Sequence, residues 1–137
     1  MKYLDKLQPL ALLVMRLALA AIVLVHGGQK IFGGMPQHIS TVAKIGLPGW
    51  MAYLSAWAEF GGGILVLLGL LTRVGALLIT IDLAVAILKV HAKNGLRGPG
   101  GFEFPMAVAV IAFALIFFGG GPISLDWVFG GRSETRR

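Results

Sequence analysis

Residues 50–71, WMAYLSAWAEFGGGILVLLGLL, decide how the chain folds. The stretch is apolar over about twenty residues, the length at which a helix crosses the hydrocarbon core of a bilayer. Glu59 lies near its middle, where an acidic group costs about 2.5–3.5 kcal/mol. We therefore expect Glu59 to be protonated, paired with a cation or facing a polar cavity. The glycines at 61–63 should let a second helix approach closely.

The composition indicates that the whole chain is a membrane protein. Hydrophobic residues make up 57% of the 137 residues and charged residues 13%, whereas charged residues are about a quarter of a soluble domain. The net charge is +6, and the basic residues gather at the ends of apolar segments. They indicate topology and contacts with anionic lipid, and no basic face suited to nucleic acid is visible. The absence of cysteine excludes thiol chemistry and cysteine-ligated metal centres.

Four apolar segments predict an all-α integral membrane four-helix bundle, formed as a single transmembrane domain by residues 1–137. The expected spans lie at about 9–32, 50–71, 74–91 and 102–121. The connector 33–49 is broken by glycine and proline, but Ile39, Val42, Ala43 and Leu47 recur at roughly helical spacing. This pattern predicts a short interfacial helix between the first and second spans.

Charge at the segment ends predicts the orientation of the bundle. An even number of crossings puts both termini on one side of the membrane. That side carries a small excess of basic residues, which includes the C-terminal Arg132, Arg136 and Arg137. The excess favours cytoplasmic termini in a multi-pass protein of a bacterial-type inner membrane.

The polar residues of the spans are expected to form two groups at different depths. At about 1.5 Å per residue, Glu59 and Asp82 fall near the midplane. We predict a ligand pocket in the outer half of the bundle, with a quinone as the candidate ligand. Its candidate lining residues are His26, Lys30, Glu59, Lys89, His91 and Glu103. The buried polar residues expected to have structural roles are Arg16, Arg73, Asp82 and Asp126, with Arg73 and Asp126 forming a pair at the inner end.

Each of these side chains also has a purely structural explanation. Glu59 and Asp82 could pair with cations or carry a proton without any ligand. The lysines near the segment ends could extend to the headgroups, and His26 could hydrogen-bond within the bundle. Paired haem ligation by His26 and His91 would need matching depths, which the spacing does not give. No local motif predicts a metal site.

Short motifs along nearly the whole chain match one family. The matching residues are Arg16, His26-Gly27, Lys30-Ile31-Phe32, Glu59-Phe60-Gly61-Gly62, Leu70-Leu71-Thr72-Arg73, His91, Asn94-Gly95, Glu103, Gly119-Gly120-Gly121-Pro122 and Ser124-Leu125-Asp126. In these motifs the sequence resembles the DoxX family of small four-helix membrane proteins. The resemblance implies association with redox systems, namely quinone-linked oxidation of thiosulfate or related sulfur compounds, and membrane complexes that handle thiol or superoxide stress. It implies no single reaction, since more distant relatives include cargo receptors and assembly factors.

Together these observations predict a quinone-interacting subunit or accessory of a membrane redox system, with a bound quinone as its cofactor. The expected partners are the lipid bilayer, a redox-enzyme subunit and further copies of the chain. No side chain here holds an electron, so the redox centre would come from a partner or a bound cofactor. Whether the chain is itself an enzyme is left open. The alternatives are a non-enzymatic lipid-binding, transport or assembly helper, and a proton carrier that uses Glu59 and Asp82.

Overall fold

The computed structural model describes residues 1–130, and every regular element in this range is helical, which confirms the all-α prediction. The helices are α1 (Lys2–Asp5), α2 (Gln8–Gln29), α3 (Met35–Lys44), α4 (Met51–Leu68), α5 (Thr72–Ala86), α6 (Glu103–Phe118) and α7 (Leu125–Gly130). Three short helical turns complete them, η1 (Lys30–Gly34), η2 (Ile87–His91) and η3 (Ala92–Asn94). The three C-terminal arginines used to predict the topology lie outside the described residues.

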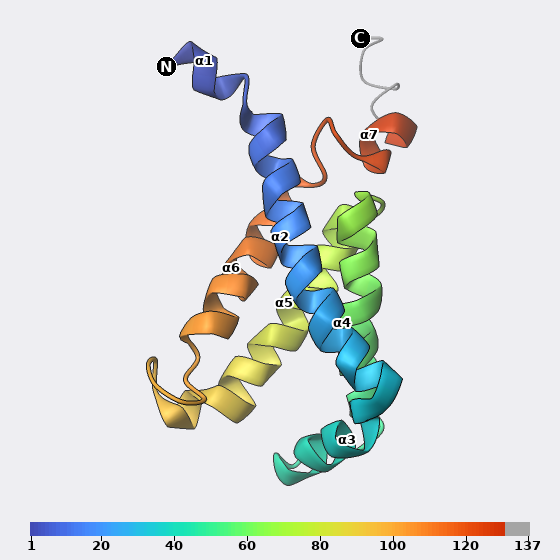
Figure 1. The fold of residues 1–137 in the computed structure, drawn as a ribbon, viewed down its shortest axis with the longest axis vertical. Coiled ribbons are helices and arrows are strands. Elements are labelled where there is room, and N and C mark those ends of the chain that lie inside the picture. The colour runs from blue at the N-terminus through green and yellow to red at the C-terminus, as the bar shows by residue number, and fades with distance from the viewer. Residues whose placement is uncertain (131–137) are drawn as a thin grey trace.

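The long helices are those of a membrane protein. Three helical stretches are long and apolar enough to cross a bilayer: Gln8–Lys44, Met51–Leu68 and Thr72–Asn94. The apolar α6 has 16 residues, so four spans and their exact bounds stay predictions. α1 and α7 lie at one end of the bundle, while α3 and the loop between α5 and α6 lie at the other (Figure 1).

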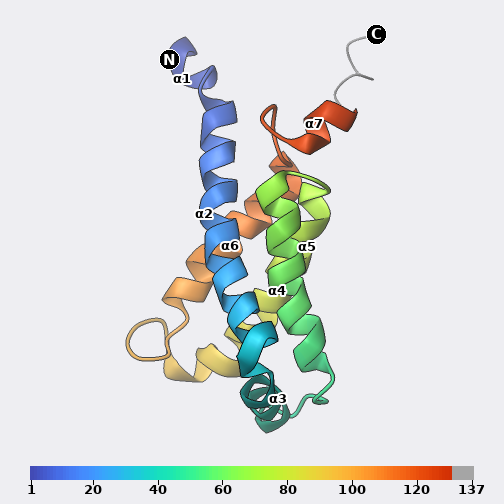
Figure 2. The same cartoon turned by 45° about the vertical axis from the view of Figure 1, so that its right-hand side comes forward.

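Glycine sets how closely the helices cross. α4 lies between α2 and α5 (Figure 2). A Cβ on Gly27 of α2 would lie 2.6 Å from the backbone nitrogen of Phe60, so this crossing tolerates no side chain. On the other side of α4, a Cβ on Gly62 would lie 3.0 Å from the carbonyl oxygen of Gly75. Gly63 faces the side chains of α2, so two adjacent glycines of the 61–63 run serve two different neighbours.

A single apolar core holds the four longest helices together. Its buried residues are Leu19, Ala20, Val23, Val66, Ala76, Ile79, Leu83, Val108, Ala112 and Leu115. Many large apolar side chains on the outside of the same helices remain exposed, among them Val14, Leu67 and Phe117. Such an outer surface suits contact with acyl chains.

A helix occupies the connector, as the sequence predicts. α3 begins after a kink at Gly33 and has Pro36 in its first turn, where proline is tolerated. Gly46 follows the helix with a φ of 83°, a left-handed conformation that favours glycine. Val42 is the buried residue of α3, so the helix is held to the bundle mainly by one side of its surface.

Candidate functional site

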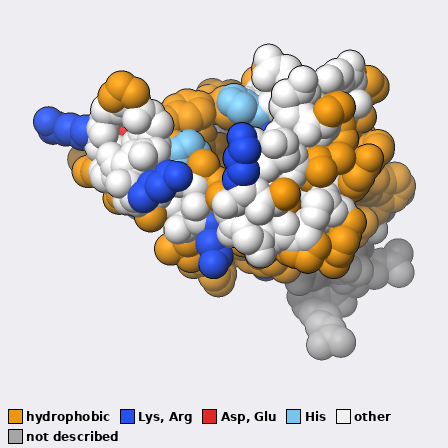
Figure 3. Space-filling view, turned by 90° about the horizontal axis from the view of Figure 1, so that it is seen from below, with side chains coloured by type: hydrophobic (Ala, Val, Ile, Leu, Met, Phe, Trp, Pro, Cys, Tyr) orange, Lys and Arg blue, Asp and Glu red, His pale blue; other side chains and the backbone are white. Residues whose placement is uncertain are grey.

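A cavity of about 630 Å³ lies between α3, α4 and α5, at the end of the bundle opposite α1 and α7. Most of its wall is apolar. Its polar side chains are Lys30, His38, Thr41, Ser55, Glu59, Asp82 and His91. Seen from this end, the surface shows histidine and basic side chains and hardly any acidic ones (Figure 3). The acidic groups of the site are therefore inside the cavity rather than on the surface around it.

An ion pair forms the inner wall of the cavity. The Nζ of Lys30 lies 2.7 Å from Oε2 of Glu59, and this is the single ion pair within residues 1–130. Glu59 is 5% exposed, whereas a quarter of the Lys30 side chain is accessible. The close crossing at Gly27 brings the two together, because Gly27 lies directly against Glu59 and one turn before Lys30. Of the three states expected for Glu59, the structure shows the paired one, on a cavity wall.

Asp82 also belongs to this site, although it was predicted among the buried residues with structural roles and not among those that line the pocket. It lies on α5, close enough to Ser55, Glu59 and Lys30 for electrostatic interaction. A second carboxyl group and a hydroxyl therefore stand beside the ion pair. The cluster can both donate and accept hydrogen bonds, and it can hold or pass a proton.

His38 is a site residue that the sequence analysis missed. It lies on α3, and its Nε2 is buried without a hydrogen bond to any residue of the described range. The missed signal is the spacing of His38, Thr41, Val42 and Ile45, which places all four on one helix face, toward the cavity. The apolar pattern of the connector predicted a helix but did not indicate that His38 would line a cavity.

The other predicted pocket residues are placed differently. His91 lies at the margin of the cavity, and its Nδ1 is 2.8 Å from the carbonyl oxygen of Gly100. The structure places His26, Lys89 and Glu103 outside the cavity, all three exposed. His26 instead hydrogen-bonds its own helix at the Ile22 carbonyl oxygen, at 2.8 Å. Lys89 lies in the wide turn η2, which breaks the helical register that would put it on the same face as Asp82.

Arg16 is the most extensively bonded polar side chain at the opposite end. It is 2% exposed. Its guanidinium donates to four backbone carbonyl oxygens, those of Val66 at 2.9 Å, Leu67 at 2.9 Å, Gly120 at 3.1 Å and Ile123 at 2.6 Å. One charged group thereby satisfies carbonyls at the end of α4 and in the loop after α6. This arrangement supports the structural role expected for Arg16.

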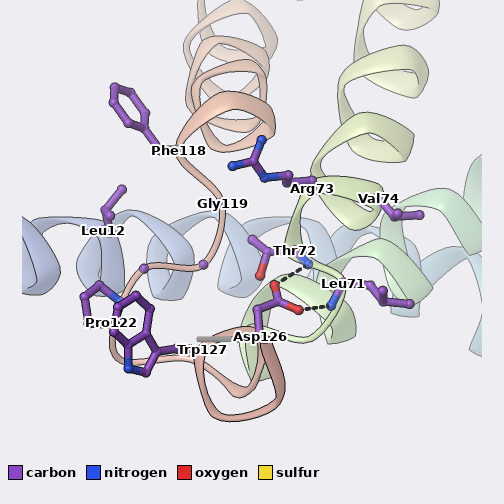
Figure 4. Close-up of a pocket in the computed structure, with 13 residues that line it drawn as sticks. Leu12, Leu71, Thr72, Arg73, Val74, Phe118, Gly119, Pro122, Asp126 and Trp127 are labelled. Atoms are coloured by element: carbon purple, nitrogen blue, oxygen red, sulfur yellow. Dashed lines mark hydrogen bonds between the residues drawn. The ribbon is translucent and has the colours of Figure 1, made fainter. Parts of the chain in front are cut away.

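Asp126 ties the same loop to the turn between α4 and α5 (Figure 4). Its two carboxylate oxygens accept from the backbone N–H of Leu71 at 2.7 Å and of Thr72 at 2.9 Å. The predicted pair of Arg73 with Asp126 is wrong. Arg73 is exposed, and its guanidinium lies beside Gly119 at the C-terminal end of α6, where the helix dipole favours a positive charge. These residues border a second cavity of about 700 Å³.

We expect Asp126 to make stability depend on pH. Partial burial acts to raise the pKa of this carboxyl, but hydrogen bonds from Thr72 and Leu71 and the charge of Arg16 outweigh it and hold the pKa below its usual value. The stabilisation is therefore complete above the unfolded value of about 4 and is lost as the pH falls through the folded value. The melting temperature in detergent should decline on acidification below about pH 4.

The control for this prediction is a matched pair of variants. Asp126→Asn should melt lower than the wild type at neutral pH and should lose less on acidification. Asp5→Asn changes an exposed carboxylate of α1 and should follow the wild-type curve. Parallel curves for the wild type and Asp126→Asn would show that Asp126 is not the titrating group.

The fold and its motifs agree with the comparison of the chain with known families. The sequence model of the DoxX family matches residues 11–92, more than half of the chain, and the protein belongs to this family. It is a helical membrane protein whose buried ion pair and cavity lie within the matched region.

Three relatives illustrate its similarity to known proteins. It is 37% identical to a Bacillus subtilis (strain 168) protein named "Putative oxidoreductase CatD" over 89% of this chain and 90% of that one. It is 28% identical to an uncharacterized protein of Haemophilus influenzae, over 92% and 96% of the two chains. "Inner membrane protein YqjF" of Escherichia coli is 38% identical over 53% of this chain and 55% of its own. No solved structure matches the chain.

Proposed function

We propose that this protein binds a quinone-type ligand in the cavity between α3, α4 and α5 and acts as an accessory of a membrane redox system. The observation that carries the proposal is the buried Lys30–Glu59 pair on the wall of a largely apolar cavity. Ligand sites in proteins commonly combine an apolar wall with a few polar groups that fix orientation. Burying a charged pair is costly unless its hydrogen bonds are satisfied, and a polar ligand head would add such bonds.

The chemistry of the cavity suits both redox forms of such a ligand. A quinone presents two carbonyl oxygens, to which Lys30 can donate. A quinol presents two hydroxyl groups, to which Glu59 and Asp82 can offer acceptor oxygens. The same carboxyl groups can hold the protons that accompany a change of redox form. Leu54, Trp57 and Ile81 line the cavity and are exposed, so a hydrocarbon tail could leave between α4 and α5 toward lipid.

The redox role also draws on the relatives. The Bacillus subtilis relative carries the name "Putative oxidoreductase CatD", and the Escherichia coli relative the name "Inner membrane protein YqjF". We extend both descriptions to this chain. We propose that it is an inner-membrane protein with cytoplasmic termini that works beside a redox-enzyme subunit. The electron-carrying centre would belong to that partner, because no amino-acid side chain of this chain supplies one.

Replacing Glu59 by glutamine tests the site. The change removes the negative charge that pairs with Lys30 and should weaken binding of a short-chain benzoquinone about tenfold, the effect of a charge-assisted hydrogen bond. Calorimetric titration of the purified protein in detergent measures the affinity. Glu103→Gln is the matched control, since Glu103 is exposed and lies outside the cavity.

A second pair of variants guards against misfolding. Lys30→Gln should weaken binding as Glu59→Gln does, whereas Lys89→Gln should not, because Lys89 is exposed and outside the cavity. Equal affinities across all four variants would remove the site assignment. A wild-type protein that shows no saturable quinone binding, but carries phospholipid or a client protein through purification, would favour the helper role instead.

A further inference from the structure

We propose that His38 is a second ligand-contacting residue of the cavity, and that its Nε2 hydrogen-bonds an oxygen on the ring of the ligand. The inference rests on the proposed quinone-type ligand and assigns that ligand a contact from α3, in addition to the Lys30–Glu59 pair. It makes α3 part of the binding site rather than a connector between the first two long helices.

The first observation is the unsatisfied nitrogen itself. Nε2 of His38 is buried, yet it makes no hydrogen bond within the described part of the chain. Buried polar atoms are nearly always hydrogen-bonded, and leaving one unpaired costs about 1–3 kcal/mol. Because His38 lines the cavity, a polar atom of a ligand there can supply the missing partner.

The second observation is the contrast with the other histidines. The chain has three. His26 and His91 each place Nδ1 2.8 Å from a backbone carbonyl oxygen, that of Ile22 and of Gly100 respectively. Those bonds fix both rings to the protein. Nε2 of His38 is the histidine nitrogen that is both buried and without a hydrogen bond within the described residues, and its residue lines the cavity.

The third observation is the position of His38 relative to the ion pair. Lys30 and Glu59 line the same cavity as His38, and their charges act on its ring. Thr41, on the same face of α3, lines the cavity as well. A ring with two oxygens could therefore contact the ion pair through one oxygen and His38 through the other. A neutral imidazole donates or accepts according to its tautomer, which suits a carbonyl oxygen as well as a hydroxyl group.

Two substitutions at His38 distinguish a hydrogen bond to the ligand from an effect of the shape of the side chain. His38→Phe keeps a planar ring but removes both nitrogens, and it should weaken benzoquinone binding about tenfold. His38→Gln places an amide nitrogen at about the reach of Nε2 and should restore affinity to within about threefold of the wild type. His26→Phe is the matched control and should leave affinity unchanged, since His26 lies outside the cavity. Equal affinity of His38→Phe and the wild type would overturn the inference while leaving the proposed function standing.

A spectroscopic measurement reports on the nitrogen directly. With only three histidines, 15N labelling of the imidazole rings gives a spectrum that single substitutions can assign. Addition of the benzoquinone should shift the Nε2 resonance of His38 and leave that of His26, which lies outside the cavity, in place. A titration in which the protein binds the quinone but the His38 resonance stays fixed would refute the contact. A wild-type protein that does not bind the quinone would refute this inference and the proposed function together.

Discussion

Replacing Arg16 by alanine is expected to lower the free energy of unfolding by about 4 kcal/mol or more. The side chain is almost fully buried and donates four hydrogen bonds to carbonyl oxygens from two distant parts of the chain. Each buried carbonyl left without a partner costs about 1–3 kcal/mol, and the lost volume adds a cavity. Effects of this size are exceptional for one substitution and arise from such buried networks.

The measurement is the melting temperature and recovered yield of the purified protein in mild detergent. Arg73→Ala is the matched control, because Arg73 is exposed and makes no ion pair within the described residues; losing its contact with the end of α6 should cost no more than about 1 kcal/mol. Arg16→Lys should recover only part of the loss, since a lysine has three donors on one atom and cannot reach four carbonyls as the planar guanidinium does. Equal melting of Arg16→Ala and Arg73→Ala would contradict the structural role of Arg16.

The second large effect is expected from Gly27→Ala, at about 2 kcal/mol of destabilisation. An added Cβ would lie 2.6 Å from the backbone nitrogen of Phe60, so α2 and α4 would have to separate. Overpacking of a tight contact costs about 1–3 kcal/mol. Because the same crossing holds Glu59 against Lys30, the substitution should also weaken quinone binding.

Gly28→Ala provides an unusually close control for Gly27→Ala. The nearest atom to a Cβ at Gly28 is a ring carbon of Phe60 at 3.7 Å, an ordinary contact distance. Alanine there also favours the helix by about 0.5–1 kcal/mol relative to glycine, so Gly28→Ala should be neutral or slightly stabilising. Thermal melting of both variants in the same detergent decides the matter. A Gly27→Ala protein as stable as Gly28→Ala would show that the crossing is looser than the structure indicates.

The sequence was sufficient to predict the helical membrane fold and to identify Glu59. Hydropathy and segment length predict the long helices, because a bilayer admits few other structures. The cost of burying a carboxylate makes Glu59 conspicuous in any membrane segment. The glycines beside it could also be interpreted as a close crossing, although the sequence could not show that Gly62 and Gly63 would face opposite neighbours.

The composition of the site was only partly predictable, because depth along a helix does not fix the direction of a side chain. His26 was predicted to line the same pocket as Glu59, but it is exposed and lies outside the cavity. The position of Lys89 depends on η2, a local widening of the helix that the residue types in this segment do not predict. The role of His38 became visible only in the structure, where α3 packs against the end of the bundle. The orientation of this helix depends on tertiary packing rather than on local propensity.

The two ends of the bundle differ in how strongly their segments are held together. At the end that carries α1 and α7, Arg16 and Asp126 fasten three separate backbone segments to one another. At the other end, α3 buries one valine side chain, worth about 1.5–3 kcal/mol. Moving α3 away from the bundle would thus cost far less free energy than separating the long helices. A lipid-borne molecule could therefore be exchanged through that end while the long helices stay packed together.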